Sequence, residues 1–192
     1  MKILGSLLLA LLIPATVFSA QPVGPEIRND AFDLGENGVP IDWIAHPGPD
    51  GNMTKFETGE AGFTIVDIDP ARAAGLGQWI QVEGGHTYKA TLATEGEGNL
   101  TFAMNFTTKI PPKIGQALRT SVLEWKSTVK AGQAGVIEGV IPAEAAYAWI
   151  SISSPMKATT DTRVIIKSVK VEDLGAAPAD SVPAAATPTP KP

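Results

Sequence analysis

Alternation of apolar and polar residues is the clearest pattern in the middle of the chain. The stretch NLTFAMNFT, 99–107, carries a large apolar residue at every second position, and side chains two apart lie on the same face of an extended strand. The stretch YKATLATE, 88–95, alternates in the same way. The connection GEG, 96–98, carries the glycines that hairpin turns favour. Together these segments predict a β-hairpin.

Other short stretches have the same character, and glycine, proline or asparagine separates most of them. No amphipathic helix of three turns or more is present, and ARAAGL, 71–76, offers a single helical turn at most. About ten strands with turn signals at this spacing are typical of two packed antiparallel sheets, so we expect an all-β jelly-roll β-sandwich. The further predicted strands are 26–32, 42–46, 62–68, 78–82, 122–129, 135–141, 147–154 and 163–171.

The tryptophans fall on both faces of the predicted strands. In YAWISISS the alanine and isoleucines share one face, which leaves Tyr147 and Trp149 on the other. In QWIQV the isoleucine and valine take the core side, which leaves Trp79 and Gln81 opposite. These aromatic rings either form a platform for a ligand or cover a sheet edge beneath a loop, since tryptophan is usually largely buried.

Two further tryptophans are assigned to packing. Trp125 shares its face with Leu123 and Val129, so it is predicted to lie in the core. Trp43 is likewise expected to be a packing residue.

The ends of the chain differ in composition from the middle. Residues 1–20 combine a positive start, a long apolar run and small residues, which together predict a secretory signal peptide. Residues 175–192 are almost wholly alanine, proline, threonine and serine, so we expect a flexible tail. One domain, 21–174, remains between them. A secreted or periplasmic location follows, and no later stretch is apolar enough to span a membrane.

Charge and cysteine content narrow the possible partners. The formal net charge is −5 and the acidic residues are scattered, which argues against nucleic acid because phosphate binding needs a basic surface. The chain has no cysteine, so disulfides and thiolate metal sites are excluded. Stability must therefore come from the packed core.

Three stretches carry a resemblance to a known family. The opening NDAFDLGENGVPIDW, 29–43, resembles the N-terminal signature of cenC-type carbohydrate-binding modules. QWIQVEGGHTYKATL, 78–92, is similar to that family's glutamine-containing strand, glycine turn and Thr-Tyr strand, and IIKSVKVEDL, 165–174, lies where such modules end. The resemblance implies a jelly roll that binds glycans. The matching positions of the signature are Asn29, Phe32, Asp33, Gly38, Pro40 and Trp43.

The same resemblance raises the question of a structural calcium ion. Acidic residues of the first and last strands often hold this ion in the family, but Lys167 and Ser168 occupy the places of two aspartates. The segment DIDP, 67–70, with Asp33 and Glu36 offers the oxygen ligands that calcium prefers. Acidic residues in turns also cap the backbone, so both alternatives stay open.

Residues suited to catalysis are sparse, and we expect no enzymatic activity. His46 and His86 are the only histidines, and both lie in predicted loops or turns. No nucleophile elbow, zinc motif or phosphate loop occurs. Paired carboxylates for glycoside hydrolysis remain an alternative, with Glu57 and Glu60 or Glu124 and Glu138 as the pairs.

Glycan binding is the function that the residues favour. Sugars present apolar C–H faces ringed by hydroxyls, which flat aromatic rings and neighbouring amides match. Thr101 and Glu124 would extend such a site if their strands adjoin it. The alternative is a structural module of the cell envelope that binds a protein partner. The predicted ligand-binding residues are Trp79, Gln81, Asn105, Tyr147 and Trp149.

Glycosylation sequons provide one competing role for part of this site. The Asn-x-Thr sequons begin at Asn52, Asn99 and Asn105 and would accept glycans in a eukaryotic secretory route. A glycan on Asn105 would compete with ligand binding there.

Overall fold

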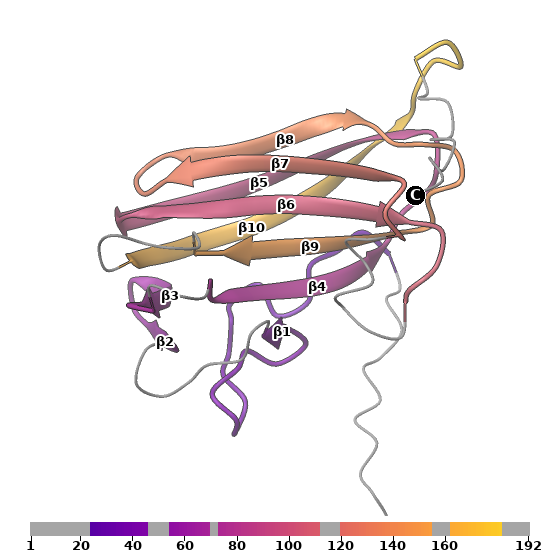
Figure 1. Cartoon of the computed structure of the whole chain (residues 1–192). Coiled ribbons are helices and arrows are strands. Elements are labelled where there is room, and N and C mark those ends of the chain that lie inside the picture. The colour runs from indigo at the N-terminus through magenta and orange to yellow at the C-terminus, as the bar shows by residue number, and fades with distance from the viewer. Residues whose placement is uncertain (1–23, 46–53, 70–72, 112–119, 155–161, 182–192) are drawn as a thin grey trace, which may run out of the picture.

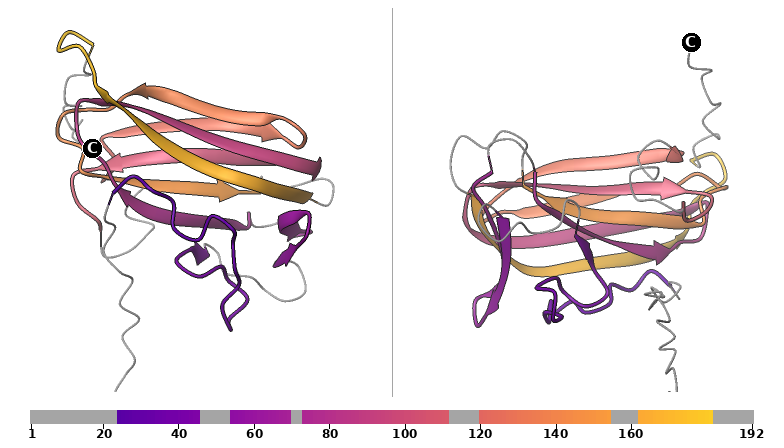
Figure 2. Two further views of the ribbon diagram at one scale, coloured as in Figure 1. Left: turned by 180° about the vertical axis from the view of Figure 1, so that it is seen from behind. Right: turned by 60° about the horizontal axis from the view of Figure 1, so that its bottom comes forward.

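The computed structural model describes residues 24–45, 54–69, 73–111, 120–154 and 162–181. Within these ranges ten strands form two five-stranded antiparallel sheets that pack face to face, and Figures 1 and 2 show the two layers. The predicted all-β sandwich of two antiparallel sheets is therefore confirmed. Within the described ranges no helix is long and apolar enough to cross a membrane.

The first sheet has the strand order β1, β4, β9, β6, β7 and the second has the order β2, β3, β10, β5, β8. The strands of the first sheet are β1 (Ile44–Ala45), β4 (Gly75–Gln81), β9 (Tyr147–Ser153), β6 (Asn99–Thr107) and β7 (Leu123–Lys130). Those of the second are β2 (Thr54–Gly59), β3 (Gly62–Asp67), β10 (Thr162–Ala176), β5 (His86–Glu97) and β8 (Ala134–Val140).

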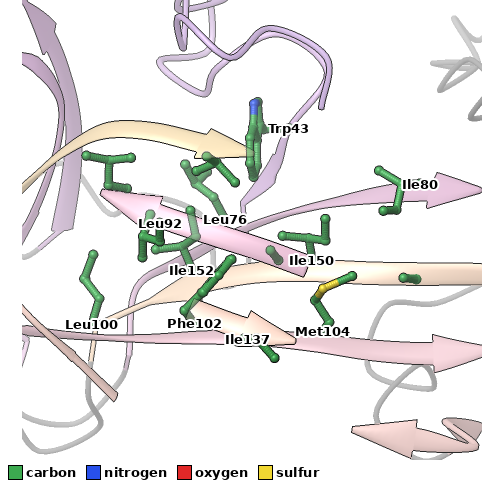
Figure 3. Packing of buried hydrophobic residues seen from close by; sticks show 14 of the residues in the cluster. Trp43, Leu76, Ile80, Leu92, Leu100, Phe102, Met104, Ile137, Ile150 and Ile152 are labelled. Atoms are coloured by element: carbon green, nitrogen blue, oxygen red, sulfur yellow. The ribbon is translucent and has the colours of Figure 1, made fainter. Parts of the chain in front are cut away.

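The core fills the space between the sheets with the alternating apolar residues of the strands. Phe102 and Met104 of β6 and Ile150 of β9 are fully buried there, as are Leu92 of β5 and Ile80 of β4. Figure 3 shows these side chains pointing into the interior from their strands. Because side chains alternate along a strand, one face of each strand is apolar and points into the core.

Both tryptophans assigned to packing lie in or against this core. Trp43 is buried and its ring stacks on Phe32, with 4.9 Å between the ring centroids. Trp125 packs against the core beside Phe106, at 4.6 Å, and its indole covers Gly139 of the opposite sheet. The predictions for both residues are confirmed.

The predicted hairpin between β5 and β6 is wrong, although both strands exist. β5 pairs with β10 and β8 of the second sheet, whereas β6 pairs with β9 and β7 of the first. Gly96 and Gly98, with φ angles of 92° and 106°, carry the chain from one sheet to the other. The two apolar faces therefore meet across the core instead of side by side.

Several predicted strand boundaries also differ. Residues 26–32 form no strand, because Asn29 and Phe32 have φ angles of 50° and 58° that interrupt an extended backbone. Of 42–46, only Ile44–Ala45 is a strand within the described part. β2 was not predicted, and the expected helical turn at 71–76 is not formed where it is described, since Gly75 and Leu76 begin β4.

The signature loop is held together by the side chain of Asn29. Its Nδ2 donates to the carbonyl oxygens of Asp33, at 3.0 Å, and Ile41, at 2.7 Å, while its Oδ1 accepts from the Asp33 amide. This asparagine therefore organises the turn that brings Phe32 and Trp43 onto the core.

β10 runs beyond the point at which the sequence suggests a flexible tail. It ends at Ala176, which pairs with His86, and the amide of Ala177 donates to the carbonyl of Gly85 at 3.0 Å. The last strand thus closes over the start of β5.

Candidate functional site

The five predicted ligand-binding residues lie together on the face of the first sheet that points away from the core, which we call the outer face. Trp79 of β4 is directly opposite Trp149 of β9, and Trp149 is opposite Asn105 of β6. Gln81 is opposite Tyr147 in the next row. The three strands β4, β9 and β6 are neighbours, so the adjacency that the sequence left open is present.

The two indole rings contact each other but are not exposed. Their centroids are 5.3 Å apart at an interplanar angle of 53°. Trp79 is 8% exposed and Trp149 is 4% exposed, and Ile44, Ile110 and Tyr147 pack against the pair. The expected orientation away from the core is therefore present, but an open aromatic platform is not, because these side chains cover the rings.

Gly77 is a residue of this site that sequence reasoning missed. It lies two positions before Trp79 on the same face of β4, and a Cβ there would stand 2.0 Å from Cζ2 of Trp149. Only a glycine leaves room for the indole to lie against the strand. The available signal was a glycine two residues before Trp79, next to the predicted strand 78–82.

Asn105 and Thr107 are buried on the outer face without hydrogen-bond partners. Both are 1% exposed, and among the described residues neither side-chain heteroatom of Asn105 nor the hydroxyl of Thr107 has a partner. A buried polar group left unpaired costs about 1–3 kcal/mol. Burial also makes Asn105 a poor glycan acceptor in the folded protein, whereas Asn99 is exposed. Thr107 was not predicted, although it shares the face of Asn105 two residues earlier.

The accessible part of the site is formed by other members of the same face. Gln81 is exposed and Tyr147 is partly exposed. Thr101 lies two rows along β6, opposite Ser153, and Glu124 of β7 is exposed opposite Asn105. Amide, hydroxyl and carboxylate groups therefore surround the buried indoles.

Gln81 lines a surface pocket of about 410 Å³. Its walls include Gly24, Glu83, Tyr88 and Asp173, so it lies where β4 ends, β5 begins and β10 ends. The backbone amide of Gln81 donates to the backbone carbonyl of Gly24 at 3.1 Å, which holds the segment at Gly24 against this end of β4.

A hydrogen-bond network fixes the polar wall of the pocket. The Tyr88 hydroxyl donates to Asp173 Oδ2 at 3.0 Å and accepts from the Glu83 amide at 2.8 Å, while His86 Nδ1 lies 3.0 Å from both Asp173 oxygens. Burial raises the pKa of Tyr88 to about 12, and Asp173 adds to this rise against the opposing Glu83 amide. Burial alone would raise the pKa of Asp173, but hydrogen bonds from the Gly175 amide, His86 and Tyr88 hold it below its usual value.

The predicted calcium ligands do not come together in the described part of the chain. Asp67 is fully buried and accepts hydrogen bonds from the Thr54 hydroxyl at 3.1 Å and the Asp69 amide at 3.0 Å. The Ser154 hydroxyl and the Ala74 amide also donate to it. These donors satisfy the carboxylate without a cation.

Asp33 and Glu36 are exposed in the signature loop. No group of three or more histidine, cysteine, aspartate or glutamate residues suited to a metal ion occurs among the described residues. The side chains placed here do not fit a calcium site, and the ion stays a prediction of the resemblance.

The two carboxylate pairs considered for hydrolysis lie in different parts of the fold, and the members of one pair belong to different sheets. Glu124 lies on the outer face of the first sheet, whereas Glu138 belongs to the second sheet and lies 4.0 Å from Lys89. Glu57 is paired with Lys55 at 2.5 Å on edge strand β2, and Glu60 is exposed in the following turn. Of the two histidines, His86 belongs to the pocket network, and His46 lies outside the described residues.

Comparison with known proteins finds similarity to solved structures only at the level of the fold. No protein-family model matches the sequence, and no curated protein matches it either. A solved structure described as "CBM4 structure and function" is 19% identical, has a TM-score of 0.51, and is covered to 99% by 77% of this chain.

The enzymatically active domain of tailspike protein 4 of bacteriophage CBA120 is 11% identical, with a TM-score of 0.50 over 70% of this chain. This chain spans only 20% of that one. Similarities at this level of identity concern the fold, and the chain has the jelly-roll fold found in carbohydrate-binding modules.

Proposed function

We propose that this protein is an exported carbohydrate-binding module that holds a glycan at the outer face of the first sheet without altering it. The observation that carries the proposal is the buried side-chain amide of Asn105, which has no hydrogen-bond partner among the described residues and lies directly opposite Trp149, whose indole contacts that of Trp79. Similarity of fold to a CBM4 structure supports it. The apolar run at 1–20 supports export.

Asn105 and the indoles supply complementary parts of sugar recognition. An amide offers two donors and one acceptor oxygen, so it can pair with neighbouring hydroxyls of one sugar ring. Indole faces cover the apolar C–H groups of the same ring. Pairing with hydroxyls would also remove the cost of the unsatisfied Asn105 amide.

Access to this site requires a local rearrangement. Ile110 follows β6 and packs against the indole pair, whereas Gln81 and Tyr147 remain in contact with solvent. A glycan therefore meets Gln81 and Tyr147 first and reaches the indoles once the Ile110 side chain gives way. A smaller residue at position 110 should lower the free energy of this step.

A glycan panel followed by calorimetric titration tests the proposal. The purified protein should bind at least one polysaccharide, and Asn105→Ala should weaken binding tenfold or more, about 1.4 kcal/mol. Asn99→Ala, at the exposed start of the same strand, should leave affinity unchanged. Ile110→Ala should raise the affinity or the association rate.

Two results would contradict the proposal. One is the absence of binding across plant, algal and bacterial wall polysaccharides. The other is binding that Asn105→Ala leaves intact, which would place the ligand elsewhere. Release of reducing sugar from a bound glycan would contradict the absence of catalysis.

A further inference from the structure

The pocket beside Gln81 continues the proposed glycan site, and the inference below rests on that proposed function. Gln81 belongs to both: it is opposite Tyr147 on the outer face and it lines the pocket. The pocket volume of about 410 Å³ lies within the range of small-molecule sites, about 300–1,000 Å³. A glycan that lies along Tyr147 and Gln81 can therefore extend into this pocket.

The chemistry of the pocket is dominated by hydrogen-bond acceptors. Glu83 and Asp173 contribute carboxylates, and no lysine or arginine is among the described residues that line the pocket. The Glu83 side chain is 74% exposed, and its carboxylate lies 3.5 Å from His86 Nε2. Because the Glu83 side chain is exposed, its carboxylate can turn from His86 toward an incoming ligand.

The second carboxylate is fixed in place. Asp173 receives hydrogen bonds from Tyr88, His86 and the Gly175 amide, which keep it ionised and oriented. A rigid anion needs little reorganisation when a positive group arrives, and a charge-assisted hydrogen bond is about twice as strong as a neutral one. The same charges repel an anionic ligand.

We propose that this pocket is a second subsite of the glycan site and takes a sugar unit that carries a free amino group. The ammonium group hydrogen-bonds to Glu83 and Asp173 while the rest of the chain lies on the outer face. Amino-sugar glycans are therefore preferred over neutral glycans of the same linkage, and uronate glycans are excluded from the pocket.

Three β-1,4-linked hexasaccharides provide a matched test, because they differ at carbon 2. They are the glucosamine hexamer, its N-acetylated form and cellohexaose, titrated into the purified protein at the same neutral pH and ionic strength. The glucosamine hexamer should bind at least tenfold tighter than the other two. Added salt should reduce this preference, because it screens exposed charges.

Two variants locate the preference. Glu83→Gln should abolish it, so that this variant binds the glucosamine hexamer and cellohexaose with equal affinity. Glu172→Gln removes the same charge from an exposed position of β10 paired with Lys89, and it should retain the preference. Asn105→Ala should weaken all three ligands alike.

The outcomes separate this inference from the proposed function. Equal affinity for the three hexamers, or a preference that survives Glu83→Gln, overturns the amino-sugar subsite while glycan binding stands. A preference lost equally in Glu172→Gln is general charge attraction and also overturns the subsite. Failure of these hexamers and of the wider polysaccharide panel to bind overturns the proposed function itself.

Discussion

At the scale of single residues, two buried amides of the first sheet have opposite surroundings. Gln78 is fully buried, and its side chain bonds to both backbone groups of Arg28 and to the carbonyl of Asp42. Asn105 is equally buried but unpartnered among the described residues. The first amide stabilises the fold, whereas the second costs stability. An unsatisfied amide that lowers stability and lies next to paired indoles is typical of a residue that binds a ligand.

Substitution of each amide by an apolar residue of similar shape should separate these roles. Asn105→Leu should raise the free energy of unfolding by about 1 kcal/mol, because it removes an unsatisfied group, and should abolish glycan binding. Gln78→Met should lower the free energy of unfolding by about 1–3 kcal/mol, because it leaves backbone partners unpaired. Urea denaturation measures both, and a destabilised Asn105→Leu protein would show that the amide has a structural partner.

At the scale of elements, the end of β10 is joined to the start of β5 by side chains as well as backbone. Asp173 of β10 accepts from Tyr88 of β5 and contacts His86. The phenol must stay neutral to donate this hydrogen bond, and burial, with a smaller contribution from Asp173, raises its pKa to about 12. The hydrogen bond that joins the end of β10 to β5 is therefore sensitive to alkaline pH.

The direction of this sensitivity follows from the pKa of Tyr88, which is raised from 10.0 to about 12. A group with a raised folded-state pKa contributes full stability below its unfolded pKa and loses it as the pH rises through the folded pKa. The free energy of unfolding should fall between pH 10 and about 12.

Tyr88→Phe tests this assignment. The variant should be less stable than the wild type at neutral pH but should lose less stability across the alkaline window. Urea denaturation at a series of pH values measures the difference. Parallel profiles for the two proteins throughout the window would contradict the role of the phenol.

At the scale of the whole molecule, the buried carboxylate of Asp67 joins the two sheets at one end. It ends β3 of the second sheet, accepts from Thr54 of β2, and accepts from Ser154, which directly follows β9 of the first sheet. The Ala74 amide donates to the Ser154 hydroxyl at 2.7 Å immediately before β4. The network therefore stabilises the stacking of the sheets on which the outer face depends.

Asp67→Asn should destabilise the protein by about 1–3 kcal/mol, because an amide nitrogen faces donors where an oxygen accepted. Glu60→Gln, at an exposed turn beside β2, is the control and should change stability by less than about 0.5 kcal/mol. Urea denaturation of both variants provides the measurement. Equal stability of Asp67→Asn and the wild type would mean that the network does not hold the sheets together.

The sequence by itself determined the fold class and the face on which each strand residue lies. Alternation is local, since each side chain points opposite to its neighbour in an extended backbone. For this reason Trp125 was correctly assigned to packing, and Trp79, Trp149 and Asn105 were correctly assigned to the side away from the core. Trp43, assigned to packing as a residue of the N-terminal signature, also lies in the core. None of these assignments needs knowledge of strand partners.

The tertiary structure alone decided which strands are neighbours and what covers them. Two alternating strands joined by glycines satisfy the same pattern as a hairpin or as a crossing between sheets, and burial of both apolar faces selected the crossing for β5 and β6. Ile110 packs against the indoles although it is distant from them in sequence. The pocket at Gln81 is likewise lined by segments that are far apart in sequence. Such contacts depend on packing of the whole chain, which no local period encodes.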